Sequence, residues 1–163
     1  MNKLTLNLLI LLTIPCILYG RHFNVMDFGA RGNGISDDAI AIQKAVDACT
    51  NAGGGDVVFS ANHTFLSGPV QLKSNVNIVL ETNSVWKANP DESIYHLSAF
   101  GKNEGEGMMW IWAKDVENLS FSGHGTIHGN GIRFMGAELF DSYELKPVTT
   151  FDPRPHVLTL MGV

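Results

Sequence analysis

The sequence has little cysteine and little charge. Its two cysteines are Cys16 and Cys49, and Cys16 lies in an apolar leader, so a chain without that leader cannot form an internal disulfide. Charged residues make up 17% of the chain, the formal net charge is −5, and no run of basic residues occurs. These features exclude the basic surface of a nucleic-acid-binding protein. They also leave apolar burial and backbone hydrogen bonds to stabilise the fold.

Long apolar runs are missing except at the start of the chain. Met1-Asn2-Lys3 is a short basic start, and residues 4–19 are almost wholly apolar. A run of about 16 residues is short for a membrane-spanning helix, which needs about 20. We therefore predict a signal peptide over residues 1–20, a secreted or periplasmic location, and no stable membrane span. A membrane anchor is the alternative. Lipid attachment at Cys16 is a weaker alternative, because the preceding residues Thr13-Ile14-Pro15 do not fit the pattern before a lipidated cysteine.

Only one segment after the leader has the pattern of a helix. Ser36 is placed as its N-cap, with Asp37 and Asp38 in the first turn, where carboxylates favour the helix dipole. Apolar residues then recur at helical spacing up to the glycines at 53–55: Ala39, Ile42, Val46 and Cys49. The sequence therefore predicts a single amphipathic helix near the start of the mature chain.

The remaining chain consists of short β-branched runs separated by Gly, Asn, Ser or Pro, which is typical of many short strands. Strands are expected at residues 23–28, 57–59, 64–66, 70–72, 76–80, 84–86, 109–113, 118–121, 126–127 and 156–160. Residues 77–85 resemble residues 118–127, which begin 41 residues later. Leaving out most of the loop at 89–107 gives a period of about 20–25 residues, as in solenoids. An all-β parallel β-helix whose first coil is covered by the helix is favoured over a sandwich or jelly roll.

Several motifs resemble one known family. Residues 23–34 (FNVMDFGARGNG), the Ser36-Asp37-Asp38 run and residues 53–76 resemble the N-terminal segment of the pectin-lyase-like superfamily. Residues 123–131 resemble its G-x-G-x-I-D-G-x-G turn, with His128 in place of the usual Asp, and Arg154-Pro155-His156 resembles the start of a further coil. Together these motifs are similar to polygalacturonases of glycoside hydrolase family 28.

This resemblance implies that residues 21–163 form the N-terminal part of one right-handed parallel β-helix domain, truncated at its C-terminus. It also implies a monomer, when complete, that acts on pectic polysaccharide without a cofactor. The reaction would be inverting hydrolysis, in which two carboxyl groups roughly 6.5–9.5 Å apart act as acid and base. The action of a lyase or epimerase on the same fold, or carbohydrate binding without catalysis, stays open.

The family's catalytic signatures are an Asn-Thr-Asp run, an Asp-Asp pair, a Gly-His-Gly and an Arg-Ile-Lys. The first and last are missing, and Asp37-Asp38 and Gly123-His124-Gly125 occur in the wrong context. The family's catalytic Asp residues are therefore expected beyond Val163, and the chain alone is expected to be an inactive fragment. Structural roles are predicted for Ser36, Asp37 and Asp38 at the helix start, and for Gly123, Gly125 and Gly129 in the turn.

Two further sets of residues are candidates for binding. His124 and His128 are four residues apart, but this spacing brings two metal ligands together only on a helix, so no metal site is expected. Trp110 and Trp112 alternate along a strand, which would point both indoles to one side. They could stack on a sugar or pack against the loop at 89–107. That loop carries Glu92, Glu104 and Glu106 and would repel an acidic substrate.

Overall fold

The computed structural model of the chain describes residues 20–98, 108–138, 145–147 and 155–163. Predictions for the signal peptide, Cys16, Glu104, Glu106 and Arg154 fall outside these residues. Among the described residues, no helix has the length and apolar character needed to cross a membrane.

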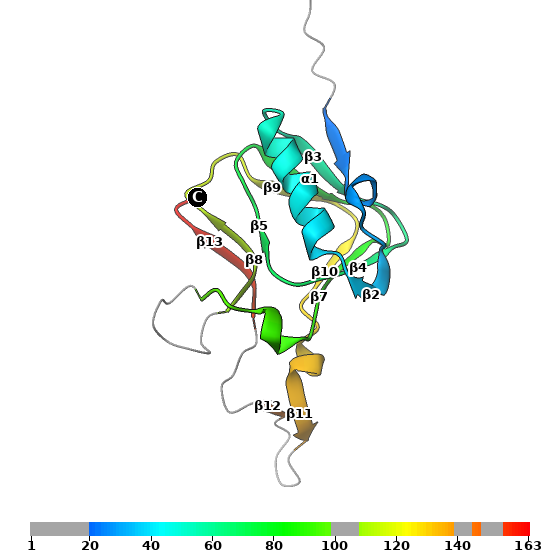
Figure 1. Cartoon of the computed structure of the whole chain (residues 1–163), viewed down its shortest axis with the longest axis vertical. Coiled ribbons are helices and arrows are strands. Elements are labelled where there is room, and N and C mark those ends of the chain that lie inside the picture. Colours follow the sequence, from blue (N-terminus) through cyan, green and yellow to red (C-terminus); the bar gives the residue numbers. More distant parts are fainter. Residues whose placement is uncertain (1–19, 99–107, 139–144, 148–154) are drawn as a thin grey trace, which may run out of the picture.

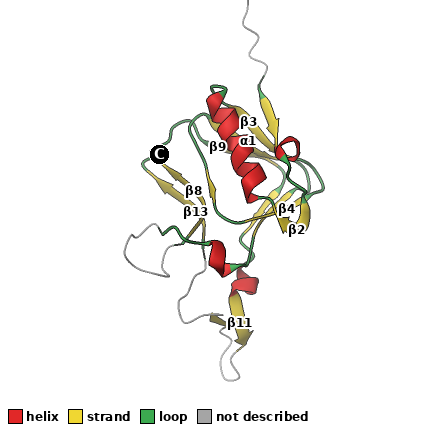
Figure 2. Ribbon diagram, in the orientation of Figure 1, coloured by secondary structure: helices red, strands yellow, loops and turns green. Residues whose placement is uncertain are grey.

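Most strands of the described chain lie in three parallel sheets, which we name A, B and C (Figure 2). Sheet A contains β1 (His22–Asn24), β3 (Gly55–Phe59), β6 (Val76–Leu80) and β9 (Ser120–Gly123). Sheet B contains β2 (Asn33–Asp37), β4 (Thr64–Ser67), β7 (Val85–Ala88) and β10 (Thr126–His128). Sheet C contains β5 (Val70–Gln71), β8 (Met109–Lys114) and β13 (His156–Met161).

From β3 onward, the chain visits sheets A, B and C in turn and then repeats the circuit. Pairing is parallel throughout these sheets, and neighbouring coils are 21 residues apart at Asp56 and Asn77 and at Asn62 and Asn83. This arrangement is a right-handed parallel β-helix, so the predicted fold and period are confirmed.

The internal repeat is present, but its predicted alignment is wrong by two residues. Asn77 pairs with Ser120, 43 residues later, and not with Asn118. Asn118 instead lies over Asn75, and its Nδ2 donates to Asn75 Oδ1 at 2.8 Å. Both asparagines have positive φ, 62° at Asn75 and 55° at Asn118, which Asn tolerates better than most residues. These asparagines mark the turn between sheets C and A, so they precede the strand.

The helix α1 (Ala39–Asn51) covers one end of the stack and contacts β1, β3, β5 and β6 (Figure 1). It buries Ala41, Ile42, Ala45, Val46 and Cys49. Burial and the charge of Asp56 raise the pKa of the Cys49 thiol to about 11.

The helix begins later than the sequence predicts. Its N-cap is Asp38, whereas Ser36 lies in β2, so the prediction that Ser36 caps the helix is wrong. The Ser36 hydroxyl instead accepts hydrogen bonds from the Arg31 guanidinium and the Asn33 amide, each at 3.2 Å. The segment expected as a strand to Phe28 also ends early, because the Asn24 side chain caps the 3-10 helix η1 (Val25–Phe28) by accepting from Met26 N–H.

Aromatic side chains fill the interior between the sheets. Phe59 lies 4.7 Å from Trp86 and 5.2 Å from Phe65, measured between ring centroids. The remaining elements are η2 (Glu92–Ile94), η3 (Gly131–Phe134) and the antiparallel pair of β11 (Met135–Glu138) with β12 (Leu145–Pro147). This pair projects beyond the stack in Figure 1.

Candidate functional site

Asp37 and Asp38 are occupied by structural hydrogen bonds. Asp38 is 2% exposed, and its carboxylate accepts from the backbone N–H groups of Arg31 at 2.7 Å and Gly32 at 3.0 Å. Asp37 Oδ1 accepts from Ala39 N–H at 2.8 Å, and Oδ2 accepts from Gly68 N–H at 3.1 Å and from Asn89 Nδ2 at 2.7 Å. The pair therefore connects the helix start to two turns of the stack and leaves little freedom for acid–base chemistry.

The Gly123-His124-Gly125 run is a tight turn over Leu80. The N–H groups of His124 and Gly125 both donate to the Leu80 carbonyl, at 2.8 and 3.0 Å. Gly123 has a φ of 99°, and a Cβ there would collide with the same carbonyl oxygen. A Cβ at Gly125 would lie 2.7 Å from Leu80 Cβ. The turn thus requires glycine at both positions because neighbouring coils approach so closely.

His128 occupies the position where the resembling family has Asp. Its Nδ1 accepts a hydrogen bond from Asn130 N–H at 3.0 Å, so the imidazole serves as a short-range acceptor in the turn. A Cβ at Gly129 would lie 2.8 Å from Val157 Cγ2. His124 and His128 are both exposed, and the described residues hold no group of three or more side chains suited to a metal ion.

The two tryptophans of β8 do not form one platform. Trp110 is fully buried, lies 5.7 Å from Trp86 between ring centroids, and donates from Nε1 to Ser67 Oγ at 3.1 Å. Sugar contact by Trp110 is therefore excluded, because its side chain has no exposed surface. Trp112 is partly exposed and alternates with the core residues Ile111 and Ala113, so its indole lies on the outer face of sheet C.

The outer face of sheet A offers few free polar groups. Asn77 Nδ2 donates to Asp56 Oδ1 at 2.8 Å, while the Ser120 and Ser122 hydroxyls donate to Asn77 Oδ1 at 2.9 and 3.1 Å. His22 Nδ1 also lies 3.4 Å from Asp56 Oδ2. These side chains stabilise one another across four strands, which leaves this face poorly suited to bind a ligand.

The outer face of sheet C has a different character. Gln71, Trp112 and Thr159 are aligned across its three strands. Among the described residues, the Gln71 side-chain amide has no hydrogen-bond partner, and the buried Thr159 Oγ1 also lacks one. Lys114 follows two residues after Trp112 and is exposed. An amide, an indole and an ammonium group thus share one face, a combination suited to recognising a polar ligand.

Long connections also gather at sheet C. The connections from β3 to β4, β4 to β5 and β5 to β6 are short, whereas residues 89–108 precede β8 and residues 129–155 precede β13. Both long connections therefore lead to the same end of sheet C. Binding residues often lie on loops held by a rigid scaffold, so this sheet is the best candidate for a binding face.

The first part of the connection to β8 packs firmly on the stack. The Tyr95 hydroxyl donates to the Asn89 carbonyl at 2.7 Å, and its ring meets Phe134 in a T-shaped contact at 5.9 Å. Burial, with a further contribution from the charges of Asp37 and Asp91, raises the pKa of Tyr95 far above its usual range. Tyr95 thus acts as a neutral anchor for this loop.

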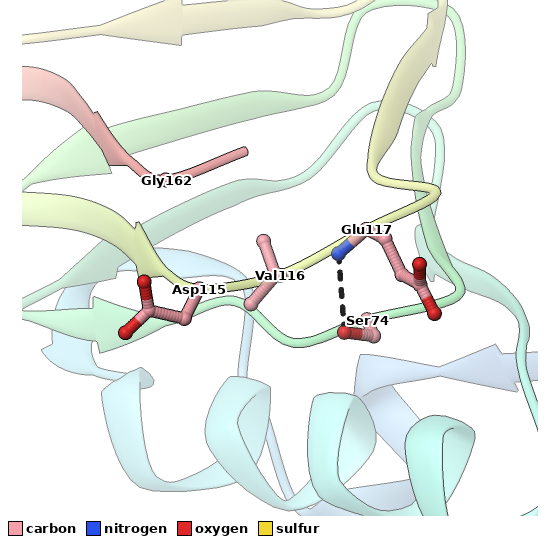
Figure 3. A pocket seen from close by; sticks show the side chains of 5 residues that line it. All are labelled: Ser74, Asp115, Val116, Glu117 and Gly162. Carbon is pink, nitrogen blue, oxygen red and sulfur yellow. Dashed lines mark hydrogen bonds between the residues drawn. The ribbon is translucent and has the colours of Figure 1, made fainter.

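A shallow pocket of about 410 Å³ lies at the other end of the sheet C strands. It is lined by Ser74, Asp115, Val116, Glu117 and Gly162, and Glu117 N–H donates to Ser74 Oγ at 3.2 Å (Figure 3). The carboxylates of Asp115 and Glu117 point away from each other in Figure 3. They do not face a common point, as a pair acting on one glycosidic bond would.

Residues 22–92 match the family model described as rhamnogalacturonase A/epimerase, pectate lyase-like. Mannuronan C5-epimerase AlgE2 of Azotobacter vinelandii is 48% identical over 64 residues, covering 35% of this chain and 6% of that protein. The probable polygalacturonase At3g15720 of Arabidopsis thaliana is 28% identical over 120 residues, covering 66% of this chain and 23% of that protein.

Among solved structures, a hyperthermoactive exopolygalacturonase from Thermotoga maritima is 30% identical with a TM-score of 0.58, covering 68% of this chain and 25% of that one. The chain therefore matches a quarter or less of the length of each of these three proteins. The family match and the three-sheet stack together identify a pectin-lyase-like domain with the right-handed parallel β-helix fold, structurally similar to polygalacturonases.

Proposed function

We propose that this chain is the N-terminal part of a polygalacturonase-type glycoside hydrolase that hydrolyses O-glycosidic bonds in pectic polysaccharide. The observation that carries this proposal is the extent of the likeness. In sequence, similarity to the Arabidopsis polygalacturonase extends over 66% of the chain, whereas similarity to the epimerase covers 35%.

The proposed mechanism is inverting hydrolysis. A carboxylic acid protonates the leaving oxygen while a second carboxylate, roughly 6.5–9.5 Å away, activates water on the opposite face of the sugar. Coils that follow Val163 in a longer protein would supply both groups. The described coils would then have two roles: α1 covers one end of the stack, and sheet C begins the face along which the polysaccharide lies.

The test compares the 163-residue chain with a longer protein that continues through the following coils. Incubation of the longer protein with polygalacturonate is expected to release reducing ends of inverted anomeric configuration, observed by NMR. The 163-residue chain is expected to release none. An unsaturated, ultraviolet-absorbing product would contradict hydrolysis and indicate a lyase, and reducing ends released by the short chain would contradict its inactivity.

A second candidate function is epimerisation at C5 of a uronic acid polymer. The observation in its favour is the 48% identity to a mannuronan C5-epimerase, which exceeds the 28% and 30% identity to the polygalacturonases. An epimerase would change the sugar configuration without creating chain ends, so NMR of the same incubation distinguishes it. A non-catalytic carbohydrate-binding β-helix would bind the polymer and leave it unchanged, since fold alone does not fix activity.

We also propose that residues 1–20 direct export and that the complete protein is a secreted or periplasmic monomer. Expression with the leader is expected to yield a mature protein that begins after Gly20, as measured by N-terminal sequencing, and that elutes as a monomer. Retention on membranes that is abolished by Cys16→Ser would instead indicate a lipid-anchored protein.

A further inference from the structure

Lys114 shares the outer face of sheet C with Trp112. The side chain between them, Ala113, is fully buried in the core, so residues 112 and 114 both point outward. Two residues along a strand span about 6.6 Å, a distance that one sugar residue can bridge. Trp112 and Lys114 are therefore placed to contact the same sugar.

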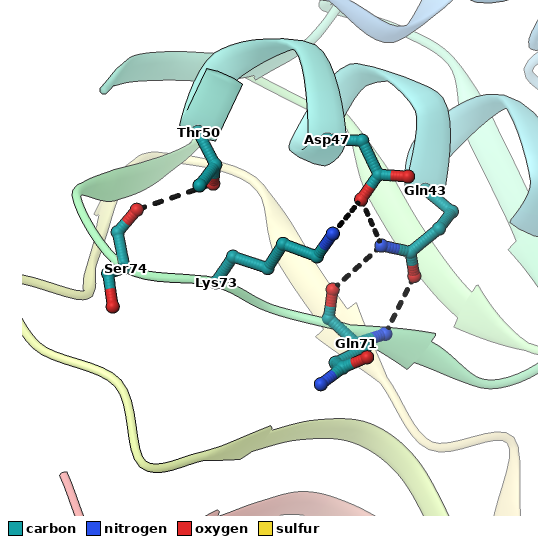
Figure 4. Close-up of polar contacts among 6 residues, drawn as sticks. All are labelled: Gln43, Asp47, Thr50, Gln71, Lys73 and Ser74. Atoms are coloured by element: carbon teal, nitrogen blue, oxygen red, sulfur yellow. Dashed lines mark hydrogen bonds and ion pairs between the residues drawn. The ribbon is translucent and has the colours of Figure 1, made fainter. Parts of the chain in front are cut away.

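The ammonium group of Lys114 forms no ion pair with the residues that the structure describes. Leu72 N–H donates to the Trp112 carbonyl, which continues the parallel pairing of β5 with β8. Lys73 is therefore aligned with Lys114 of the neighbouring coil. Lys73 Nζ lies 2.7 Å from Asp47 Oδ1 on α1 (Figure 4). Among the described residues, no carboxylate lies within 4.0 Å of the Lys114 ammonium. Of these two aligned lysines, only Lys114 keeps its charge available to a ligand.

Trp112 supplies the apolar part of the same surface. Its indole lies between Gln71 on β5 and Thr159 on β13, on the middle strand of the sheet. A flat indole flanked by an amide can contact the face of a sugar ring while the amide reaches its hydroxyls. On the neighbouring turn, Asp115 and Glu117 would repel a second negative charge and so restrict where an anionic group can bind.

We propose that Trp112 and Lys114 form a subsite for a negatively charged sugar residue. The ring of the sugar packs against the Trp112 indole, and its carboxylate or sulfate accepts a charge-assisted hydrogen bond from Lys114 Nζ. This inference rests on the proposed function only in that the ligand is a polysaccharide. It is independent of whether the polymer is hydrolysed, epimerised or left unchanged.

The test measures binding of the full chain to three probes: trigalacturonate, its neutral counterpart α-(1→4)-galactotriose, and a sulfated ι-carrageenan oligosaccharide. Wild-type chain is expected to bind an acidic probe with an affinity that falls as salt rises. Lys114→Gln is expected to weaken this binding about tenfold and to flatten its salt dependence, while Lys114→Arg retains it. Trp112→Ala is expected to lose both acidic and neutral ligands. Preference for the carboxylate or the sulfate probe identifies the anionic group.

Lys87 provides the matched control, because it is a lysine on the outer face of sheet B, aligned with Leu66 and His128. Lys87→Gln is expected to leave binding unchanged. The subsite would be overturned if Lys87→Gln and Lys114→Gln weakened binding equally, or if Lys114→Gln had no effect. It would also be overturned if a wild-type chain with a cooperative thermal transition bound neither acidic probe. Binding is measured without turnover, so an unsaturated product from the longer protein would refute the hydrolase proposal and leave this one intact.

Discussion

The two ends of the described β-helix are built from similar strands but differ in which described elements cover them. At the α1 end, the side chains of Ile42 and Val46 are fully buried against the first coil. At the other end, Leu158 and Leu160 of β13 pair with the fully buried Ile111 and Ala113, yet are 42% and 44% exposed. Equivalent apolar positions are thus buried or exposed according to whether another element is stacked on them.

The α1 end also satisfies its backbone. Gln43 Nε2 donates to the Gln71 carbonyl at 3.0 Å, and Gln43 Oε1 accepts from Gln71 N–H at 2.9 Å (Figure 4). The side-chain amide therefore pairs with the edge strand β5 as a further strand would. This arrangement blocks edge-to-edge association at that end, which an uncovered edge permits.

The largest expected difference between the two ends is the loss of stability when an apolar side chain is shortened to alanine. Ile42→Ala shortens a fully buried side chain on the core-facing side of α1 and is expected to lower the free energy of unfolding by about 2–5 kcal/mol. Leu158→Ala, at a partly exposed position, is expected to cost about 1 kcal/mol or less. Urea denaturation of the two variants measures both values. Equal losses would show that β13 is as well packed as the covered end.

Glycine substitution tests whether the end of the described stack opposite α1 is also tightly packed. Gly123→Ala places a Cβ against the Leu80 carbonyl and is expected to cost about 1–3 kcal/mol. Gly131 has no atom within 4 Å of the Cβ position, so Gly131→Ala is the matched control with little expected change. The thermal midpoints of both variants measure the effect. A Gly123→Ala variant as stable as the Gly131→Ala control would mean that the turn over Leu80 can relax.

The same contrast explains which features the sequence predicts. Most strands, the helix stripe and the coil period follow from local patterns of apolar and turn residues, and the structure confirms them. The position of the N-cap does not follow from local patterns. Ser36 and Asp38 both favour an N-cap, and contacts with residues distant in the sequence decide which of them precedes the helix. Asp38 binds the backbone of Arg31 and Gly32, while β2 pairs with β4 although its sequence has the character of a turn.

In the candidate site too, contacts between residues distant in the sequence decide what local patterns cannot predict. Trp110 and Trp112 are equivalent in the sequence pattern, but only Trp110 is fully buried, where it contacts Trp86 and the Ser67 hydroxyl of another sheet. Lys114 was not predicted as a binding residue. Its place two residues after Trp112 on a strand is visible in the sequence, but the pairing of the aligned Lys73 with Asp47, which leaves Lys114 without a carboxylate among the described residues, depends on contacts between α1 and the stack.

Removal of the Gln43 amide is expected to have a smaller effect than Ile42→Ala or Gly123→Ala. Gln43→Leu loses both hydrogen bonds to Gln71 and is expected to cost about 1–2 kcal/mol. Gln43→Glu keeps the acceptor for Gln71 N–H but places a carboxylate oxygen against the Gln71 carbonyl and Asp47 Oδ1, so a loss of at least the same size is expected. Faster hydrogen exchange at the Gln71 amide and faster labelling of the buried Cys49 thiol are the expected local changes. Unchanged exchange at Gln71 would show that the amide does not protect this edge.

The smallest expected effect concerns the ion pair between Asp47 and Lys73. Burial alone would raise the pKa of Asp47, but hydrogen bonds from Lys73 and Gln43 and the charge of Lys73 hold it below its ordinary value of 3.8. Because the pKa is lower in the folded chain, the pair stabilises it fully above that ordinary value and loses this contribution as pH falls through the folded pKa. Both side chains are well exposed, at 39% and 40%, so the contribution is expected to be below about 1 kcal/mol.

Urea denaturation of the wild type at a series of pH values measures this contribution. Wild type is expected to lose stability more steeply below about pH 4 than Asp47→Asn, whose side chain does not titrate. Lys73→Met is expected to make the profile shallower as well, because it removes the cation that lowers the Asp47 pKa, whereas Lys114→Met is the control that leaves the profile unchanged. Parallel profiles for the wild type and Asp47→Asn would mean that α1 covers its end of the β-helix through apolar contacts and the Gln43 amide, without the ion pair.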